Sequence, residues 1–505
     1  MDEHLGRMAA EFGDRTAFSV VDVGTMTFAE WDGAANALAR RLLDAGLEPG
    51  GRVGIHLQPE LALRWLVSYS AAHRAGGVAV PMNPRLAPAE VAHVLAHSGA
   101  GAVVAAGDLV AHDLESADGR LAVLIDAGTE GSGAAPPVLA WDDAVTGDRS
   151  SFQAPREKDD LADILYTSGT TGRPKGVAVR HSNGQMVGSV EPNWTGGGWL
   201  HSSPLFTFAG IALVYTPMKF GLQVIYQPRF DADRWLRVVE EDRPVSVFLV
   251  PAMAHLLIDH PRFDEADLSC VQLCSVGSAP LAPYVLERLQ TKMPAALVSN
   301  NYGMTEAGTA YAIMPQGEAV KRPGSVGQIA PPAVVEIVGD DGDPLPAGEV
   351  GEVRLQVPGR QREYYNDPEA TAETWRDGWL ITGDLGKLDA DGYLYIVGRS
   401  KDVIIRGGNN VHATDVEHVL VQHEAIKEVA VVGAPHPVLG EDVVAFIVLQ
   451  PDALATPDEL REFGLAQLAD YKVPRQFVFV DALPRNPTGK VVKPELRARL
   501  AETSP

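Results

Sequence analysis

A loop rich in glycine and hydroxyl side chains, at residues 166–177, constrains this chain more than any other stretch. It reads YTSGTTGRPKGV, and its interior has almost no apolar side chain with which to pack as core. The flanking runs 161–166 and 177–179 are apolar and predict buried strands. Glycines let the backbone approach a ligand, and successive backbone N–H groups can form a nest for an anion. With the cations Arg173 and Lys175, the pattern predicts a binding loop for a polyphosphate.

A plain hairpin loop and a kinase-type phosphate loop both fit this stretch less well. A plain hairpin loop needs only one or two glycines and leaves the hydroxyls and Lys175 unexplained. The phosphate loop of kinases and ATPases requires G-x-x-x-x-G-K-[ST] at the start of a helix. Here Gly169 and Gly172 are followed by Pro-Lys-Gly, so that spacing fails. We predict that the contacts of this loop to a polyphosphate come from Thr167, Ser168, Gly169, Thr170, Thr171 and Lys175.

Composition limits the class of protein. A chain of 505 residues is long enough for two or three domains. Its net charge of -24 disfavours nucleic acid or an anionic membrane surface as a partner. Cys270 and Cys274 fall on one predicted strand, roughly 13 Å apart, which is too far for a disulfide. The apolar run 208–218 is too short to span a bilayer, and the first residues lack a signal-peptide pattern. We therefore expect a cytoplasmic protein in a reducing compartment, with no transmembrane segment and no nucleic-acid partner.

The order of predicted elements indicates an α/β fold. Helical patterns at 28–47 and 61–75 alternate with apolar strands at 52–55 and 78–80, which predicts a mostly parallel sheet covered by helices. From residue 324 the pattern changes to short strands and tight turns. We predict a large N-terminal domain at 1–400 that includes a small β subdomain at about 324–400, followed by a small α+β C-terminal domain at 401–505.

One histidine pair has the spacing of a metal site. His93 and His97 lie one helical turn apart on a predicted helix, and this spacing can bind zinc. No third ligand lies nearby in the sequence, so a solvated helix face is the better prediction.

Strand ends and a tyrosine-containing segment carry the next candidate residues. The strand at 247–250 ends at Pro251, and the strand at 271–276 ends in Gly-Ser-Ala-Pro. Open α/β sheets bind ligands at the carboxyl ends of such strands. In the segment 300–306, Tyr302 can stack on adenine, Thr305 can bind phosphate and Glu306 can hold Mg²⁺ through oxygen. A simple strand-end turn would explain the glycine of this segment but not the Thr-Glu pair.

Taken in order, these motifs resemble the adenylate-forming superfamily, which includes acyl-CoA synthetases, peptide-synthetase adenylation domains and beetle luciferases. The resemblance covers nearly the whole chain, and the order of motifs is far more specific than any single match. The segment YYNDPEAT at 364–371, followed by Gly378-Trp379, resembles the acyl-CoA synthetase branch in particular. The resemblance rests on the phosphate loop, on 300–306, on TGDL at 382–385, on GRSKD at 398–402 and on PRNPTGK at 484–490.

The resemblance implies a two-step reaction. A carboxylic acid is first activated by ATP and Mg²⁺ as its acyl-adenylate, with release of pyrophosphate, and the thiol of coenzyme A then displaces AMP. Between the steps the mobile C-terminal domain turns about a hinge at Lys401. A carrier protein in place of coenzyme A, and a homodimer, are further partners that the resemblance allows.

The resemblance also assigns roles to residues. Lys490 bridges the acid and the α-phosphate, Thr305 and Glu306 act on phosphate and metal, Asp384 and Arg399 hold the ribose, and Gly408 lines the thiol path. Further nucleotide contacts fall on Gly277, Ser278, Ala279, Pro280, Asn301, Tyr302, Gly303 and Met304. The acid pocket falls on Thr207, Phe208, Pro251, Gly277 and Asn300.

The chain departs from the family pattern at two places. Relatives usually have a histidine beside the acid pocket at the position of Thr207, and they have Tyr-Pro where this chain has His412-Ala413. The second change is ordinary loop variation. The first leaves open an enzyme that only forms the thioester from a supplied acyl-adenylate. The sequence also leaves open an enzyme that loads a carrier protein, a luciferase-like oxygenase and a binding protein with an inactive site. It does not identify the carboxylic acid.

Overall fold

The computed structural model describes residues 2–117, 121, 123–128, 138–167, 174–183, 188, 190–279, 281–308, 312–357, 359, 361–486 and 489–503. The chain forms two compact units, each made of three segments. Unit 1 comprises Met1–Gly277, Glu287–Ala310 and Val357–Arg376. Unit 2 comprises Ser278–Leu286, Tyr311–Gln356 and Asp377–Pro505.

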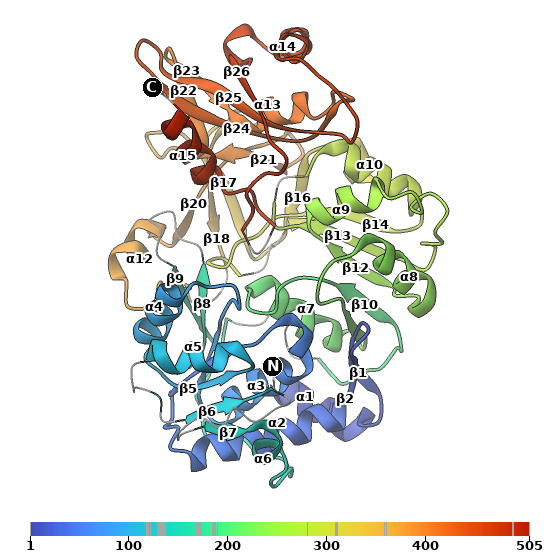
Figure 1. Cartoon of the computed structure of the whole chain (residues 1–505), viewed down its shortest axis with the longest axis vertical. Helices are drawn as coiled ribbons and strands as arrows, with labels where there is room; N and C mark the ends of the chain where they lie inside the picture. Colours follow the sequence, from blue (N-terminus) through green and yellow to red (C-terminus); the bar gives the residue numbers. More distant parts are fainter. Residues whose placement is uncertain are drawn as a thin grey trace. The chain divides into compact units, whose positions relative to one another are not determined.

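The two ends of the phosphate-loop motif belong to the first of two sheets in unit 1 (Figure 1). This sheet has the strand order β7-β6-β5-β3-β4-β8-β9. Neighbouring strands run parallel except β8 and β9, which form an antiparallel hairpin at one edge. Its strands are β3 (Arg52–His56), β4 (Val78–Pro81), β5 (Ala100–Ala105), β6 (Val123–Asp126), β7 (Val138–Ala140), β8 (Leu161–Thr167) and β9 (Lys175–Arg180).

The second sheet of unit 1 has the order β14-β13-β12-β10-β11-β1-β2. It is parallel except for the β1–β2 hairpin. Its strands are β1 (Thr16–Val20), β2 (Gly24–Thr27), β10 (Gly198–His201), β11 (Gln223–Tyr226), β12 (Ser246–Leu249), β13 (Leu273–Gly277) and β14 (Leu297–Asn301). The parallel strands bring their carboxyl ends to one edge, where candidate residues of the site follow β12, β13 and β14.

Helices fill and cover unit 1. They are α1 (Asp2–Phe12), α2 (Phe28–Asp44), the 3₁₀ turn η1 (Pro59–Leu61), α3 (Ala62–Arg74), α4 (Pro88–Ser98), α5 (Asp108–Ala117), α6 (Trp141–Val145), α7 (Phe208–Lys219), α8 (Ala232–Asp242), α9 (Pro251–Ile258) and α12 (Pro368–Thr374), with the short strand β19 (Trp375–Arg376). Helix α10 (Pro283–Lys292) contains residues of both units.

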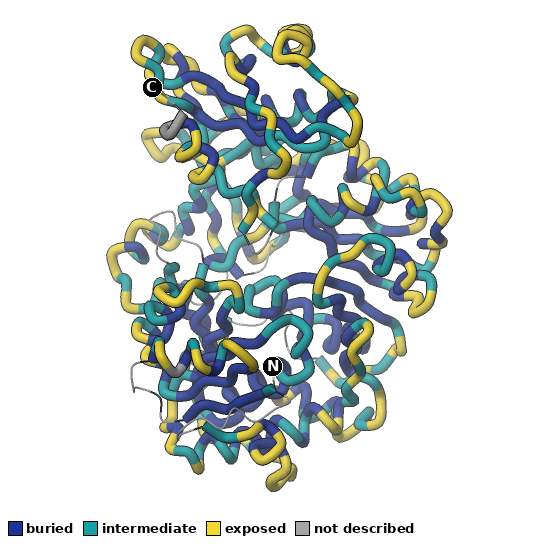
Figure 2. The backbone as a smooth tube through the Cα atoms, viewed as in Figure 1, coloured by how far each residue is buried: buried dark blue, intermediate teal, exposed yellow. Residues whose placement is uncertain are grey.

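Side chains that alternate along a strand enter different cores of unit 1. On β5, Val103 packs with α4 and α5, whereas Ala102 and Val104 pack into a larger core that contains α2 and α3. The larger core also contains Phe18 and Tyr226 of the second sheet, so α2 and α3 are buried between the two sheets. The strands are buried along most of their length (Figure 2). Continuous apolar strands of this kind are expected for parallel sheets covered on both faces.

Helix α2 illustrates how the sequence specifies these packing surfaces. Thr27 and Glu30 form a capping box that satisfies the first backbone N–H groups of the helix. Trp31, Leu38 and Leu42 recur at helical spacing and are fully buried. The buried Trp31 indole also donates to the carbonyl oxygen of Leu66 at 3.2 Å.

Unit 2 contains two further sheets. The antiparallel sheet β15-β16-β21-β20-β18-β17 corresponds to the predicted small β subdomain. Its strands are β15 (Ala312–Ile313), β16 (Ser325–Ile329), β17 (Val334–Val338), β18 (Gly351–Gln356), β20 (Trp379–Leu388) and β21 (Tyr393–Arg399), and helix α11 (Glu318–Lys321) precedes β16.

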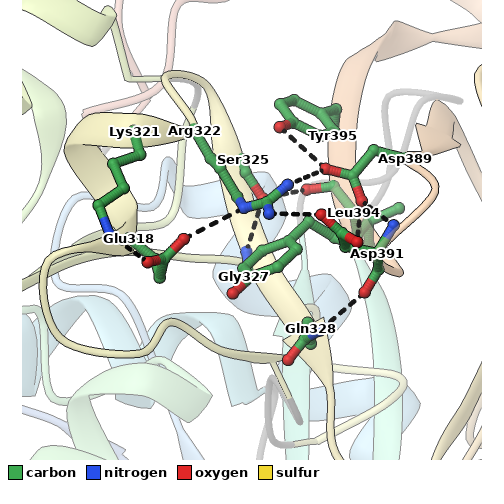
Figure 3. A network of polar contacts seen from close by, with 11 residues as sticks. Glu318, Lys321, Arg322, Ser325, Gly327, Gln328, Asp389, Asp391, Leu394 and Tyr395 are labelled. Carbon is green, nitrogen blue, oxygen red and sulfur yellow. Dashed lines mark hydrogen bonds and ion pairs between the residues drawn. The ribbon is translucent and has the colours of Figure 1, made fainter.

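Arg322 links the segment before β16 to the turn between β20 and β21 (Figure 3). Arg322 forms ion pairs with Glu318, Asp389 and Asp391, and its guanidinium lies 4.0 Å from the ring centroid of Tyr393. The start of β16 is thereby fixed to the turn between β20 and β21. The residues predicted for ribose binding lie on these two strands.

The last sheet of unit 2 has the order β23-β22-β25-β24, with β26 beside β25. Helices α13 and α15 cover opposite faces, since Val431 of β24 packs in one core with Val416 of α13 while Val432 packs in another with Leu496 of α15. The elements are η2 (Ser400–Asp402), β22 (Val403–Arg406), β23 (Asn409–His412), α13 (Ala413–Leu420), β24 (Ile426–His436), β25 (Gly440–Leu449), α14 (Pro457–Leu465), η3 (Asp470–Lys472), β26 (Gln476–Phe479) and α15 (Lys493–Thr503).

The predicted α/β fold class is confirmed, with corrections in detail. Strand β13 begins at Leu273, so Cys270 precedes it and the expected strand 270–274 is wrong, although both cysteines are free as expected. The predicted domain boundary between residues 400 and 401 stays a prediction. The division by contacts places the small β subdomain in unit 2. In the described part of the chain, no helix is long and apolar enough to cross a membrane.

Candidate active site

The β8–β9 hairpin presents the two ends of the predicted phosphate loop side by side. Thr167, the last residue of β8, pairs with Lys175, the first residue of β9. One residue further into the ladder, Gly176 pairs with Tyr166, and a Cβ on Gly176 would lie 2.7 Å from a methyl carbon of Ile164. Glycine is therefore required there for the hairpin to close. The predicted contacts Ser168, Gly169, Thr170 and Thr171 lie outside the described residues.

Helix α4 supports both stems of this hairpin. His97 Nδ1 lies 2.8 Å from the Tyr166 hydroxyl, and His93 Nε2 donates to the carbonyl oxygen of Pro174 at 3.2 Å. The prediction that these histidines form a solvated helix face is wrong, because both are half-buried against the hairpin. Burial lowers the pKa of His97 and so favours the neutral form of its imidazole. Within the described part of the chain, no group of three or more His, Cys, Asp or Glu residues is placed to hold a metal ion.

Glu306 lies in a turn that follows β14. The amide of Gly308 donates to the carbonyl oxygen of Met304 at 3.0 Å and closes this turn. The Glu306 side chain is almost fully buried, and its Oε1 accepts a 2.7 Å hydrogen bond from the Tyr364 hydroxyl. The Lys175 ammonium lies 5.4 Å from the centroid of the Tyr364 ring. One tyrosine therefore joins the predicted metal ligand to the lysine of the phosphate loop.

Arg362 holds the backbone beside Glu306. Its guanidinium is buried, donates to the carbonyl oxygen of Thr305 at 2.8 Å and also donates to the carbonyl oxygen of Asn183. The guanidinium lies 4.3 Å from the ring centroid of Phe208, a predicted pocket residue. A Cβ on Gly308 would lie 2.9 Å from this guanidinium, so glycine leaves the space that Arg362 occupies.

The segment that carries Arg362 and Tyr364 extends the hairpin edge. Ala178 N–H donates to the carbonyl oxygen of Glu363 at 2.8 Å, and Tyr365 N–H donates to that of Gly176 at 2.7 Å. The amide of Tyr364 itself donates to Thr371 Oγ1 on α12. Residues 363–365 are therefore fixed to β9, the strand that begins with Lys175.

The carboxyl ends of β12, β13 and β14 position the predicted pocket residues. Pro251 begins α9 directly after β12 and is buried, as is Asn300 on β14. Gly277 pairs with Asn301, and a Cβ on Gly277 would lie 3.0 Å from the carbonyl oxygen of Asn301. Close approach of the two strand ends therefore favours glycine. Tyr302, Gly303 and Met304 continue from β14 into the turn, Ser278 and Ala279 belong to unit 2, and Pro280 lies outside the described residues.

Thr207 has a local role that the sequence argument missed. It caps α7: its Oγ1 accepts from the amide of Gly210 at 3.0 Å and donates to the carbonyl oxygen of Pro204 at 2.8 Å. Threonine immediately before an apolar helix is a recognisable N-cap signal. The hydroxyl is thus committed to the helix end.

The ribose, hinge and thiol-path candidates all lie in unit 2. Asp384 on β20 pairs with Arg399 on β21, with Arg399 Nε 2.9 Å from Asp384 Oδ1. Lys401 lies in η2, where desolvation and then the charge of Arg399 lower the pKa of its ammonium group. Gly408 is exposed in the β22–β23 turn at a φ of 84°, a conformation that favours glycine.

Lys490 is exposed in unit 2. Asn486 binds the backbone of Lys490 on both sides: its Oδ1 accepts from the Lys490 amide at 2.9 Å, and its own amide donates to the Lys490 carbonyl oxygen at 2.8 Å. Arg485 donates to the carbonyl oxygen of Gly489 and pairs with Glu428 on β24. The backbone of Lys490 is therefore held by Asn486, while Arg485 joins this segment to β24.

Removal of the Thr207 cap should destabilise unit 1 measurably. Thr207→Ala loses the hydroxyl that caps α7 and should cost about 1 kcal/mol of unfolding free energy, whereas Thr207→Ser keeps the capping hydroxyl and should leave the unfolding free energy nearly unchanged. The midpoints of urea-induced unfolding compare the two variants directly. Equal shifts for serine and alanine would show that the hydroxyl does not act as a cap.

Comparisons with known proteins show the family to which the chain belongs. The family model described as "AMP-binding enzyme" matches residues 5–365, and the model "AMP-binding enzyme C-terminal domain" matches 415–490. The chain is 34% identical over 479 residues to a feruloyl-CoA synthase of an Amycolatopsis species, covering 94% of each chain. It is 32% identical over 495 residues to the fatty acid–[acyl-carrier-protein] ligase ScoC of Streptomyces coeruleorubidus, covering 94% of this chain and 92% of that one.

The fold is also similar to solved structures of the same group. ATP-bound MatB from Rhodopseudomonas palustris matches with a TM-score of 0.86 and 30% identity, over 98% of both chains. The family models together span both units, and the relatives match over nearly their whole length. The chain is therefore an enzyme of the AMP-binding family, the adenylate-forming superfamily that its motifs resemble.

Proposed function

We propose that this enzyme is an AMP-forming carboxylic acid:CoA ligase. It activates a carboxylic acid as its acyl-adenylate with ATP and Mg²⁺, and it transfers the acyl group to the thiol of coenzyme A. The main observation in support is that Lys175 and Glu306 both contact Tyr364 beside the end of the phosphate loop: Lys175 contacts its ring and Glu306 its hydroxyl. That arrangement provides a cation for phosphate and a carboxylate for a metal within one unit.

The residues present fit a magnesium ion. Glu306 supplies a hard carboxylate ligand, and the Tyr364 hydroxyl occupies one lone pair of Oε1, which leaves Oε2 able to bind a cation. When bound, Mg²⁺ would offset the negative charge of the phosphates. Lys175 and Thr167, at the two ends of the loop, would contact the β- and γ-phosphates.

Adenylation then requires correct placement of the acid. The carboxylate oxygen attacks the α-phosphorus and pyrophosphate leaves, so the step depends on charge stabilisation and alignment. In our proposal Lys490 binds the carboxylate and the α-phosphate, while Asp384 and Arg399 orient the ribose. The pocket residues Thr207, Phe208, Pro251, Gly277 and Asn300 would accept an acid with an apolar body.

Thioester formation needs a path for a thiol and does not need Lys490. The thiol attacks the acyl carbon, and AMP departs with the former carboxylate oxygen. We propose that the change of step involves rotation about Lys401 and that Gly408 lines the path of the pantetheine arm. The similarity to a feruloyl-CoA synthase supports coenzyme A as the acceptor. The similarity to ScoC supports a carrier-protein thiol as the second candidate.

Pyrophosphate release tests the function directly. Incubation with ATP, Mg²⁺ and a panel of aromatic and aliphatic acids should give pyrophosphate with a subset of the acids, and addition of coenzyme A should then yield the thioester. Thioester from a supplied acyl-adenylate, with no pyrophosphate from any acid, would instead identify the enzyme of the second step only. Transfer to a phosphopantetheinyl carrier protein but not to coenzyme A would favour the carrier-loading enzyme.

Substitution of Lys490 should separate the two steps. Lys490→Ala should slow pyrophosphate release by about a hundred- to a thousandfold, the usual effect of losing one such electrostatic contact. Thioester formation from supplied acyl-adenylate should be retained. Lys493→Ala is a matched control, because it removes a neighbouring cation whose partner is Glu417 on α13. Equal losses in both steps would contradict the role assigned to Lys490.

A backbone made rigid at residue 401 should impair thioester formation more than adenylation. Proline fixes φ near −65°, a value that the 3₁₀ conformation of η2 accepts but that restricts other conformations. Lys401→Pro should therefore retain acid-dependent pyrophosphate release and lose most thioester formation, whereas Lys401→Ala should retain both. Full overall turnover by the proline variant would exclude Lys401 as the pivot.

A further inference from the structure

Tyr364 contacts both charged groups of the candidate phosphate site through different parts of its side chain. The hydroxyl donates to Glu306 Oε1 at 2.7 Å, and the ring lies 5.4 Å from the Lys175 ammonium. We propose that Tyr364 is a positioning residue that orients Glu306 for Mg²⁺ and holds Lys175 for the β- and γ-phosphates. This inference rests on the proposed function of the same site.

The Tyr364 hydroxyl offsets part of the unfavourable free energy of burying the Glu306 carboxylate. Glu306 is only 9% exposed, and burial of an ionised carboxylate is unfavourable unless hydrogen bonds or a cation compensate it. A distance of 2.7 Å is typical of a strong hydrogen bond from a hydroxyl to a carboxylate. Because the bond fixes Oε1, it also limits rotation of the carboxylate and sets the direction of Oε2. Tyr364 therefore orients the carboxylate for a metal ion.

The ring acts on the lysine. An ammonium group is attracted to the face of a tyrosine without being neutralised. Between Lys175 and Glu306, both of which the structure describes, no direct ion pair forms. A direct pair would occupy the two groups that phosphate and metal require. By binding the ammonium on its ring and the carboxylate on its hydroxyl, Tyr364 gives each charge a partner that does not compete with MgATP.

Backbone contacts hold Tyr364 in place between Lys175 and Glu306. Tyr364 pairs with Val177, two residues along β9 from Lys175. Two residues before Tyr364, the guanidinium of Arg362 holds the carbonyl oxygen of Thr305, next to Glu306. The segment 362–365 is thereby attached both to the strand of the lysine and to the turn of the carboxylate. Tyr364 is fixed relative to both groups by interactions that its hydroxyl does not make.

Calorimetric binding of ATP, in Mg²⁺ and separately in EDTA, tests the inference without turnover. Tyr364→Phe keeps the ring and loses the hydroxyl, so its affinity for MgATP should fall about tenfold, while its affinity for ATP in EDTA stays unchanged. Tyr364→Leu also loses the ring and should lose affinity in both conditions. Tyr365→Phe removes the neighbouring hydroxyl as a matched control and should bind as the unmodified protein does.

A double-mutant comparison keeps the test independent of folding. Glu306→Gln should abolish the gain in ATP affinity that Mg²⁺ provides, and adding Tyr364→Phe to it should change nothing further. Additive losses, an unaltered MgATP affinity in Tyr364→Phe, or an equal loss in EDTA would each overturn the proposal. A failure of the proposed function would give a different result from a failure of this inference. In that case the variants would bind MgATP with the predicted affinities, but no acid would cause release of pyrophosphate.

Discussion

The antiparallel pairing of β8 with β9 is the interaction on which the candidate site depends. In a sheet that is otherwise parallel, this hairpin turns the chain back and leaves β9 as an edge strand. An edge strand has backbone groups that still need partners. Residues 363–365 supply them, and in doing so bring Tyr364 to the strand that begins with Lys175. Helix α4 supports the other side of the hairpin through His93 and His97.

The charged side chains beside this scaffold in unit 1 have separate partners. The buried Arg362 binds backbone carbonyl oxygens and the face of Phe208, which leaves the nearby carboxylate of Glu306 to Tyr364. In unit 2, Arg399 and Asp384 pair across neighbouring strands, while Arg399 remains 44% exposed. The pairing fixes these two side chains relative to each other.

Sequence reasoning predicted the elements whose signals are local. The alternation of strands and helices, the glycine loop and the Thr-Glu pair each lie within a few consecutive residues. The Tyr364–Glu306 bond joins residues 58 positions apart, and Arg362 lies in no recognisable pattern, so neither contact could be predicted from periodicity. His93 and His97 were misassigned because solvation depends on what packs against a helix. The cap at Thr207 had a local signal that the family comparison obscured. The roles assigned to the site residues, those of Lys401, Gly408 and Lys490 included, remain predictions.

The central claim is that the acid attacks the α-phosphorus of ATP and that a thiol later displaces AMP. An acid labelled with ¹⁸O in its carboxylate follows that path directly, because the attacking oxygen stays on phosphorus when the acyl carbon is transferred. Mass spectrometry of a complete reaction with ATP and coenzyme A should find one ¹⁸O atom in each AMP and none in pyrophosphate. Label in inorganic phosphate, or unlabelled AMP beside newly formed thioester, would contradict the account.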